Sequence, residues 1–246
     1  MQLRYGRRLI LARLDMRSIL LAGATGLIGV ELLARLLRDD GFDGRVIAPT
    51  RRPIGLNHPK LINLVVDATN RSDETMINIL REAGVEQLDA YACCLGSTIR
   101  KAGSRAMFAA VDHNLVLRWG RIAASFGARH ALLVSSVGAD PGSRNFYLRV
   151  KGETEHDLTQ LDFTRVDLMR PGQLLGAREE SRPMEALAQI AARAYSRLLT
   201  GTLSCYRGIA AADVADAMTA LIVTPAPERG VRIHHYDQMR ELAASR

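Results

Sequence analysis

The chain has 246 residues, 48% of them hydrophobic, and a formal net charge of +7 at pH 7. That length suits one large α/β domain, and no apolar run reaches the roughly 18 residues that span a bilayer. Of the three cysteines, Cys93 and Cys94 are adjacent, which disfavours a disulfide framework, and no cysteine–histidine spacing resembles a metal site. We therefore expect a cytoplasmic protein without a bound metal.

The basic charge comes almost entirely from arginine, since the only lysines are Lys60, Lys101 and Lys151. No basic helix with interleaved aromatic residues is visible, and aromatic residues make up only 5% of the chain, so nucleic-acid binding is not expected. Four arginines alternate with apolar residues in 1–15. This segment suits a membrane-surface or targeting segment, but we expect a disordered extension that precedes the domain at 16–246.

Apolar runs separated by glycine and proline predict strands and helices that alternate from residue 18 onward. Strands are expected at 18–22, 45–48, 61–66, 90–95, 131–134 and 163–169. Helices are expected at 30–37, 73–83, 104–126, 147–161, 181–199 and 212–223. This alternation predicts an α/β fold of the Rossmann type, a doubly wound parallel sheet with helices on both faces, and a small C-terminal appendage on the substrate side.

A glycine turn joins the first strand to the first helix, with glycines at Gly23, Gly26 and Gly29. The first glycine permits a tight turn, the second lets the backbone approach a pyrophosphate, and the third lets the helix pack against the strand. The helix N-terminus then offers unpaired N–H groups and a partial positive charge to phosphates. The order of strand, turn and helix therefore predicts a dinucleotide site.

A second motif combines Tyr147 with Lys151, one helical turn later, and with the preceding pair Ser135 and Ser136. A phenol keeps its proton until about pH 10, but an ammonium on the same helix face favours the phenolate. A serine hydroxyl can hold a carbonyl oxygen while the tyrosine gives or takes the proton. The motif predicts carbonyl–alcohol chemistry if a hydride carrier lies close by.

The end of the second strand favours NADP(H) over NAD(H). An NAD site usually places an acid about 20 residues after the glycine turn, but here Thr50 is followed by Arg51 and Arg52. Two guanidinium groups suit a 2′-phosphate, which they can bind with charge-assisted hydrogen bonds. Alternatively, they are ordinary surface arginines in an arginine-rich chain.

These features together resemble the short-chain dehydrogenase/reductase superfamily in its atypical branch, and more narrowly the Tat-interacting-protein oxidoreductases and their bacterial relatives. The resemblance covers nearly all of 18–223. It is carried by GATGLIG at 23–29, TRRP at 50–53, CCLGSTIRKAG at 93–103, LLVSSVGAD at 132–140, FYLRVKGETE at 146–155 and RPGQLLGAREESRP at 170–183.

The resemblance implies that Tyr147 is the catalytic acid and base, that Lys151 activates it, and that Ser136, with Ser135 as the alternative, completes the catalytic set. It also implies that Asp67 faces the adenine and that Lys151 binds the nicotinamide ribose. Many relatives carry a proton-relay asparagine in the long helix. The matching position here is Asp112, with Asn114 nearby, so that role stays unassigned. The implied cofactor-binding residues are Gly23, Ala24, Thr25, Gly26, Leu27, Ile28, Arg51, Arg52, Asp67, Leu95, Gly96, Ser135, Tyr147, Lys151, Pro171 and Gly172.

We therefore expect an NADP(H)-dependent oxidoreductase acting on a small-molecule carbonyl or alcohol substrate. A cofactor-sensing regulatory protein with little turnover is the alternative, because related members are described more through partner binding than through a substrate. An epimerase or dehydratase is a weaker alternative, because the segment after residue 172 looks too short for a nucleotide-sugar domain. The long helices also allow a homodimer.

Overall fold

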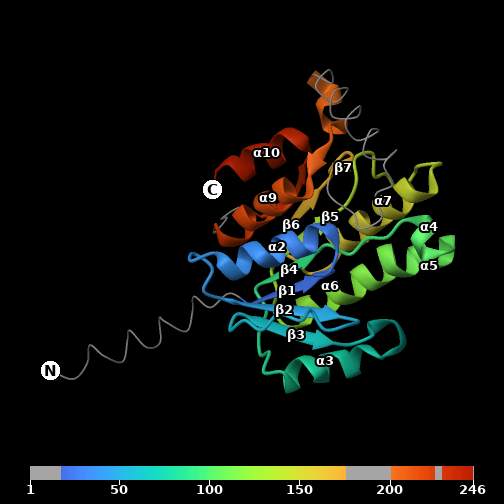
Figure 1. The fold of residues 1–246 in the computed structure, drawn as a ribbon. Coiled ribbons are helices and arrows are strands. Elements are labelled where there is room, and N and C mark those ends of the chain that lie inside the picture. Colours follow the sequence, from blue (N-terminus) through green and yellow to red (C-terminus); the bar gives the residue numbers. More distant parts are fainter. Residues whose placement is uncertain (1–17, 176–200, 225–228, 246) are drawn as a thin grey trace.

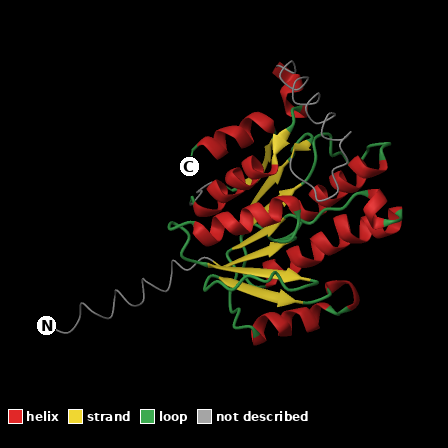
Figure 2. Cartoon of the chain, viewed as in Figure 1, coloured by secondary structure: helices red, strands yellow, loops and turns green. Residues whose placement is uncertain are grey.

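The computed structural model describes residues 18–175, 201–224 and 229–245, which form three layers with a sheet between two sets of helices (Figures 1 and 2). The seven strands are all parallel and lie in the order β3-β2-β1-β4-β5-β6-β9. Their bounds are β1 Ser18–Ala22, β2 Arg45–Thr50, β3 Leu61–Val65, β4 Ala90–Cys93, β5 His130–Val134, β6 Arg165–Met169 and β9 Gly230–His234. This order matches the Rossmann fold, and the winding reverses between β1 and β4.

Helices cover both faces of the sheet (Figure 1). One face carries α2 (Leu27–Arg38), α9 (Ala211–Val223) and α10 (Tyr236–Ala244), and the other carries α3 (Asp73–Glu82), α6 (Val116–Ser125) and α7 (Phe146–Thr159). A hydrophobic core lies on each face of the sheet, and successive strand residues point to opposite faces. Leu20 packs on the side of α6 and Leu21 on the side of α2. The predicted doubly wound α/β fold is confirmed.

The C-terminal part contains elements that the sequence pattern did not predict. Strand β9 and helix α10 follow the last expected helix, and β9 lies at the edge of the sheet. Its apolar residues Val231 and Ile233 are 51% and 43% exposed, so the strand lacks the apolar run of a buried central strand. A separate two-stranded sheet pairs β7 (Leu174–Leu175) with β8 (Ile209–Ala210), beside the short helix η3 (Gly201–Tyr206). These short elements form the small appendage.

The helix expected at 104–126 is interrupted. It consists of α5 (Arg105–Ala109), a π-helical turn η2 (Ala110–Leu115) and α6. Before it lies the one-turn helix α4 (Ile99–Ala102), which was not among the expected helices. A π turn inserts one extra residue into a helix and is frequent at functional sites. The periodicity of apolar residues alone did not reveal it.

Two predictions fall outside the described residues, namely the extension at 1–15 and the helix at 181–199. The assignment of 16–246 to one domain stays a prediction, as does the homodimer. Within the described ranges, no helix combines the length and the apolar character needed to cross a bilayer. The same ranges contain no group of three histidine, cysteine or acidic side chains arranged for a metal ion.

Candidate cofactor and proton-transfer site

Most of the predicted site residues lie at one edge of the sheet, because they follow the carboxyl ends of parallel strands. Gly23 follows β1, and Ser135 follows β5. The same holds for Arg51 after β2, Asp67 after β3, Leu95 and Gly96 after β4, and Pro171 and Gly172 after β6. In open α/β sheets, this edge is where ligands bind, at the point where the winding reverses.

The glycine turn between β1 and α2 is tight and closely packed. Gly23 has a φ of +83°, and a Cβ there would lie 2.6 Å from the backbone of Cys94 and Leu95. A Cβ on Gly29 would lie 2.0 Å from the carbonyl oxygen of Gly23, so the helix packs as closely as the sequence predicted. The N-cap residue of α2 is Gly26, which has no side chain with which to cap the helix. The first N–H groups of a helix that its N-cap residue leaves uncapped suit an anionic ligand.

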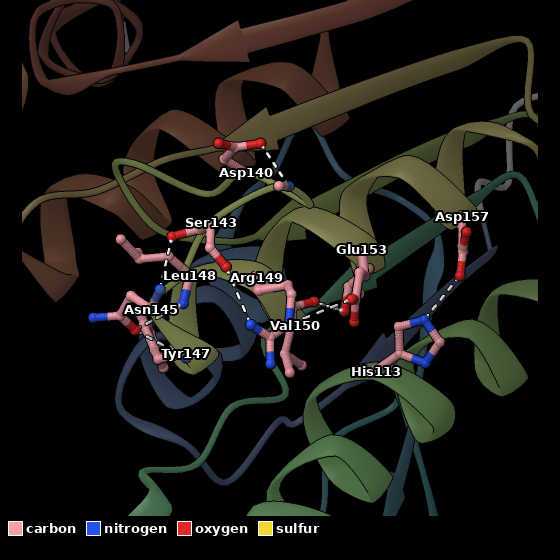
Figure 3. A network of polar contacts seen from close by, with 12 residues as sticks. His113, Asp140, Ser143, Asn145, Tyr147, Leu148, Arg149, Val150, Glu153 and Asp157 are labelled. Atoms are coloured by element: carbon pink, nitrogen blue, oxygen red, sulfur yellow. Dashed lines mark hydrogen bonds and ion pairs between the residues drawn. The ribbon is translucent and has the colours of Figure 1, made fainter.

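Helix α7 brings Tyr147 and Lys151 into the site. The Asn145 side chain accepts hydrogen bonds from the backbone N–H groups of Tyr147 (2.9 Å) and Leu148 (3.3 Å), which fixes the start of the helix (Figure 3). The ring of Tyr147 packs against Phe108 with 5.6 Å between centroids. The phenol thus sits in the first turn of α7, one turn before Lys151.

Lys151 is 5% exposed, and its Nζ lies 2.8 Å from Oδ1 of Asp112. Burial by itself lowers the pKa of Lys151, but the charges of Asp112, Tyr147 and Cys93 raise it, and the net pKa lies above its ordinary value. Lys151 is therefore a cation at neutral pH, within electrostatic reach of the Tyr147 phenol.

The two serines after β5 differ in their surroundings. The hydroxyl of the half-buried Ser136 donates to the carbonyl oxygen of Val137 at 3.2 Å. Ser135 is buried, its N–H donates to Met169 at 2.8 Å, and its hydroxyl has no hydrogen-bond partner in the described part of the chain. Both hydroxyls lie at the expected edge of the sheet, and the choice of Ser136 over Ser135 stays a prediction.

The loops after β2 and β3, which the resemblance assigns to the adenine end of a cofactor, carry exposed charged residues. Arg51 and Arg52 are exposed after β2, and Asn63 supports this segment by donating to Ala48 (2.9 Å) and to Thr50 (2.7 Å). Asp67 accepts a hydrogen bond from the N–H of Thr69 at 3.0 Å. That bond, followed by the charges of Arg51 and Arg71, lowers the pKa of Asp67.

The loops after β5 and β6 are held by close backbone contacts. A Cβ on Gly152 of α7 would lie 2.2 Å from the carbonyl carbon of Asp140, so the loop after β5 rests directly on the helix. Val137 donates to the carbonyl oxygen of Pro171 at 2.9 Å. A Cβ on Gly172 would lie 2.6 Å from the carbonyl oxygen of Arg207. The implied nicotinamide side of the site therefore has a fixed backbone.

The residue to which sequence reasoning gave no role is Asp112, on the π turn η2. Its side chain is fully buried, and besides the contact with Lys151 its Oδ2 accepts a hydrogen bond from the N–H of Ser97 at 2.8 Å. The structure thus joins the implied activating lysine to the Gly96–Ser97 segment through one carboxylate. The signal in the sequence was an acid where relatives have an asparagine.

No family model matches the chain. Curated proteins do: the chain is 34% identical over 187 residues to Protein HTATIP2 of Rattus norvegicus, which covers 72% of this chain and 71% of that protein. It is 32% identical over 214 residues to Protein fmp52, mitochondrial, of Aspergillus fumigatus, which covers 84% and 89%. The chain is also 35% identical over 163 residues to Protein FMP52, mitochondrial, of Kluyveromyces lactis, a match that covers 65% of this chain and 69% of that protein.

Solved structures share the fold at low identity. Bordetella bronchiseptica WbmG in complex with NAD has a TM-score of 0.61 and 14% identity, covering 89% of this chain and 73% of that chain. The Thermus thermophilus UDP-glucose 4-epimerase complex with NAD has a TM-score of 0.60 and 17% identity, covering 93% and 81%. These likenesses show that the chain has the same Rossmann-type fold.

The fungal relatives are named as mitochondrial proteins. This finding contradicts the cytoplasmic location that the cysteine pattern led us to expect, because cysteine usage reports only a reducing environment and not a compartment. The identity and coverage of the rat and fungal relatives, together with the Rossmann-type sheet, confirm the predicted family. The chain belongs to the group of atypical short-chain dehydrogenases/reductases that includes HTATIP2 and FMP52.

Proposed function

We propose that this protein is an NADP(H)-dependent oxidoreductase that interconverts a small-molecule carbonyl and its alcohol. The observation that carries the proposal is the buried ammonium of Lys151, one helical turn from Tyr147 and at the sheet edge that holds the glycine turn. A buried lysine that stays charged beside a phenol favours the phenolate, which a tyrosine needs to act as a base near neutral pH.

The residues at the sheet edge fit a dinucleotide. The tight turn at Gly23 and the uncapped N-terminus of α2 suit the pyrophosphate. Asp67 would lie at the adenine, and Lys151 would bind the nicotinamide ribose. When bound, the nicotinamide supplies or accepts the hydride. Residues assigned to this binding are Gly23, Ala24, Thr25, Gly26, Leu27, Ile28, Arg51, Arg52, Asp67, Leu95, Gly96, Ser135, Tyr147, Lys151, Pro171 and Gly172.

In carbonyl reduction, the Tyr147 hydroxyl gives its proton to the carbonyl oxygen as negative charge develops there. In alcohol oxidation, the phenolate takes the hydroxyl proton back. Ser136 donates a hydrogen bond that orients the substrate oxygen. Lys151 stabilises the Tyr147 phenolate, which is the product of the reduction step and the base of the oxidation step. The side chain of Asn145 caps the start of α7 and thereby fixes the backbone that carries the Tyr147 hydroxyl.

Turnover of an aldehyde and ketone panel with NADPH tests the proposal. We expect Tyr147→Phe to lower kcat by about 10²- to 10⁴-fold, the usual contribution of a positioned acid. Tyr236→Phe is the control, since that tyrosine begins α10 on the other face of the sheet. An unchanged kcat in Tyr147→Phe would disprove the mechanism. Tight NADPH binding without turnover on any carbonyl would instead favour the cofactor-sensing alternative.

The preference for NADP(H) rests on the chemistry at the end of β2. The strand ends at Thr50 without an acid for the ribose hydroxyls, and two exposed arginines follow. We expect the parent to bind NADPH more tightly than NADH. Arg51→Ala should weaken NADPH binding by about tenfold, the loss of one charge-assisted contact, and leave NADH unchanged. The exposed Arg121 on α6 provides the matched control. Tighter binding of NADH than of NADPH by the parent would contradict the proposed preference for NADP(H).

A further inference from the structure

The two arginines proposed to bind a 2′-phosphate lie on a very short loop. Arg51 and Arg52 follow β2, and Pro53 comes before Ile54, which packs against the hydrophobic core on the α2 side of the sheet. These first three residues are exposed, whereas Thr50 at the end of β2 is only 7% exposed. The arginine loop, residues 51–53, therefore lies between two anchored ends.

The end of β2 that leads into this loop is held from one side. β2 pairs with β1 from Arg45 to Ile47 and with β3 from Val46 to Thr50. From Ala48 onward, the described part of β2 thus pairs with β3 and not with β1. Figure 1 shows β2 and β3 side by side, with β3 at the edge of the sheet. The conformation of the arginine loop therefore depends on contacts with β3.

One side chain of β3, that of Asn63, contacts both ends of the arginine loop. Its Nδ2 donates to the carbonyl oxygen of Ala48 at 2.9 Å and to Oγ1 of Thr50 at 2.7 Å. Its Oδ1 accepts from the N–H of Ile54 at 2.9 Å. Since a backbone carbonyl can only accept and a backbone N–H can only donate, these partners fix the direction in which the amide points.

The hydroxyl of Thr50 extends these contacts into the loop itself. Its Oγ1 accepts from Asn63 and donates to the carbonyl oxygen of Arg52 at 2.8 Å. Hydrogen bonds from one amide and one hydroxyl thus join β3, the end of β2 and the backbone of the loop. A backbone that is already fixed has less conformational entropy to lose when a ligand binds.

A 2′-phosphate benefits from such a fixed loop, whereas a 2′-hydroxyl does not. Bidentate hydrogen bonds between a guanidinium and a phosphate need both partners in a defined geometry. A long side chain already loses rotamer freedom when it makes this contact. A fixed backbone spares the additional cost of ordering the loop. NADH lacks the phosphate, so the order of the arginine loop contributes nothing to its affinity.

We infer that Asn63 and Thr50 are positioning residues that hold the arginine loop in the conformation that receives the 2′-phosphate. They thereby determine the preference for NADP(H) without contacting the cofactor themselves. This role rests on the proposed preference for NADP(H) and deepens it. Loss of either side chain should lower the affinity for NADPH much more than the affinity for NADH.

Fluorescence titrations with NADPH and with NADH test this role. Thr50→Val removes the hydroxyl but keeps the shape of the side chain. We expect it to weaken NADPH binding by about fivefold, the equivalent of one hydrogen bond, and NADH binding by less than about twofold. Asn63→Ala loses three of the hydrogen bonds, and we expect it to weaken NADPH binding by about tenfold.

Two variants serve as controls. Thr50→Ser keeps a hydroxyl and should bind NADPH as the parent does. Asn57→Ala removes an exposed asparagine just beyond the loop and should leave the affinity for both nucleotides unchanged.

A double-mutant cycle separates positioning from a general loss of structure. In the Arg51→Ala/Arg52→Ala background, Thr50→Val should no longer weaken NADPH binding, because no guanidinium remains to be positioned. The same loss of NADPH affinity in both backgrounds would overturn the inference. Equal weakening of NADPH and NADH binding by Thr50→Val would overturn it as well.

The proposed preference and the positioning role fail in different ways. Tighter binding of NADH than of NADPH by the parent would contradict the preference, and the positioning role with it. If Arg51→Ala abolished the preference for NADPH while Thr50→Val and Asn63→Ala retained it, the positioning role alone would be wrong. These titrations need no turnover, so a protein that binds NADPH without reducing any carbonyl would contradict the proposed reaction and still test the role of Asn63.

Discussion

Two buried carboxylates, Asp112 and Asp167, are both fully shielded from solvent and both paired with a cation, yet they have different surroundings. Asp167 lies on β6 and has one oxygen 2.6 Å from His130 and the other 2.6 Å from His234, while Arg165 contacts both oxygens. Asp112 has one aligned hydrogen bond and one ion pair.

The difference follows from where the two groups lie. Asp167 is enclosed by side chains from β5, β6 and β9, which it ties together at one end of the sheet. Asp112 lies at the edge where the proposed cofactor site opens. The carboxylate of Asp167 thus links three strands of the fold. The carboxylate of Asp112 instead links Lys151 and Ser97 beside the proposed cofactor site.

The largest expected effect comes from exchanging each carboxylate for its amide. Asp167→Asn leaves Arg165 and two histidines around a neutral group, and we expect it to lower the free energy of unfolding by about 3 kcal/mol. Asp112→Asn keeps an acceptor for the N–H of Ser97 but leaves the buried Lys151 ammonium without its carboxylate. We expect a smaller loss of about 2 kcal/mol, because one cation rather than three groups loses its charged partner. Urea denaturation of both variants measures the two values. Equal losses would break the distinction between a structural and a functional carboxylate.

Acid sensitivity gives a second, smaller effect. Burial alone would raise the pKa of Asp167, but hydrogen bonds from His130, His234 and Arg165 outweigh it and hold that pKa far below its usual range. A pKa lowered by folding contributes stability above the unfolded value, about 4, and this stability is lost as the pH falls towards the folded value. We expect urea midpoints to fall more steeply below about pH 4 in the parent than in Asp167→Asn. Parallel curves would show that Asp167 is not linked to acid unfolding.

The smallest expected effect is on the affinity for NADPH and concerns Arg118, which supports the loop after β3. Arg118 of α6 contacts Asp73 at 2.5 Å and also donates to the carbonyl oxygens of Ala68 and Arg71. It thereby anchors the segment after Asp67, where the proposed adenine contact lies. Since a typical hydrogen bond contributes about 1 kcal/mol, Arg118→Met should weaken NADPH binding by about fivefold or less. Titration of NADPH fluorescence measures this, with Arg121→Met as the control, and a much larger loss would place Arg118 itself at the cofactor.

Local spacing made much of the site predictable. The glycines of the first turn lie within seven residues, and Tyr147 and Lys151 lie within one helical turn, so standard helix and turn geometry fixes their arrangement. The alternation of strands and helices then sets all strand ends at one edge. The fold class and the grouping of these residues follow from such short-range rules.

Contacts between distant parts of the chain were not predictable in the same way. Asp112 pairs with a lysine 39 positions later through a π turn that has no signature in apolar periodicity. The Asp167 cluster needs strands that begin near residues 130, 165 and 230 to be neighbours in register. β9 itself was missed, because its exposed edge position removes the apolar run that marks a central strand.

The π turn η2 also constrains how this chain can change its length. An α-helix advances about 100° per residue, and the turn between α5 and α6 absorbs one residue beyond regular winding. Deleting a single residue from 110–115 would restore unbroken winding while rotating α4 and α5 against the anchored α6. The aspartate would swing away from the amine, and the fully buried Phe108 of α5 would be turned out of its contacts with Phe146 and Tyr147. A one-residue deletion in this turn would therefore disturb the packing of α5 and the contact between Asp112 and Lys151 together.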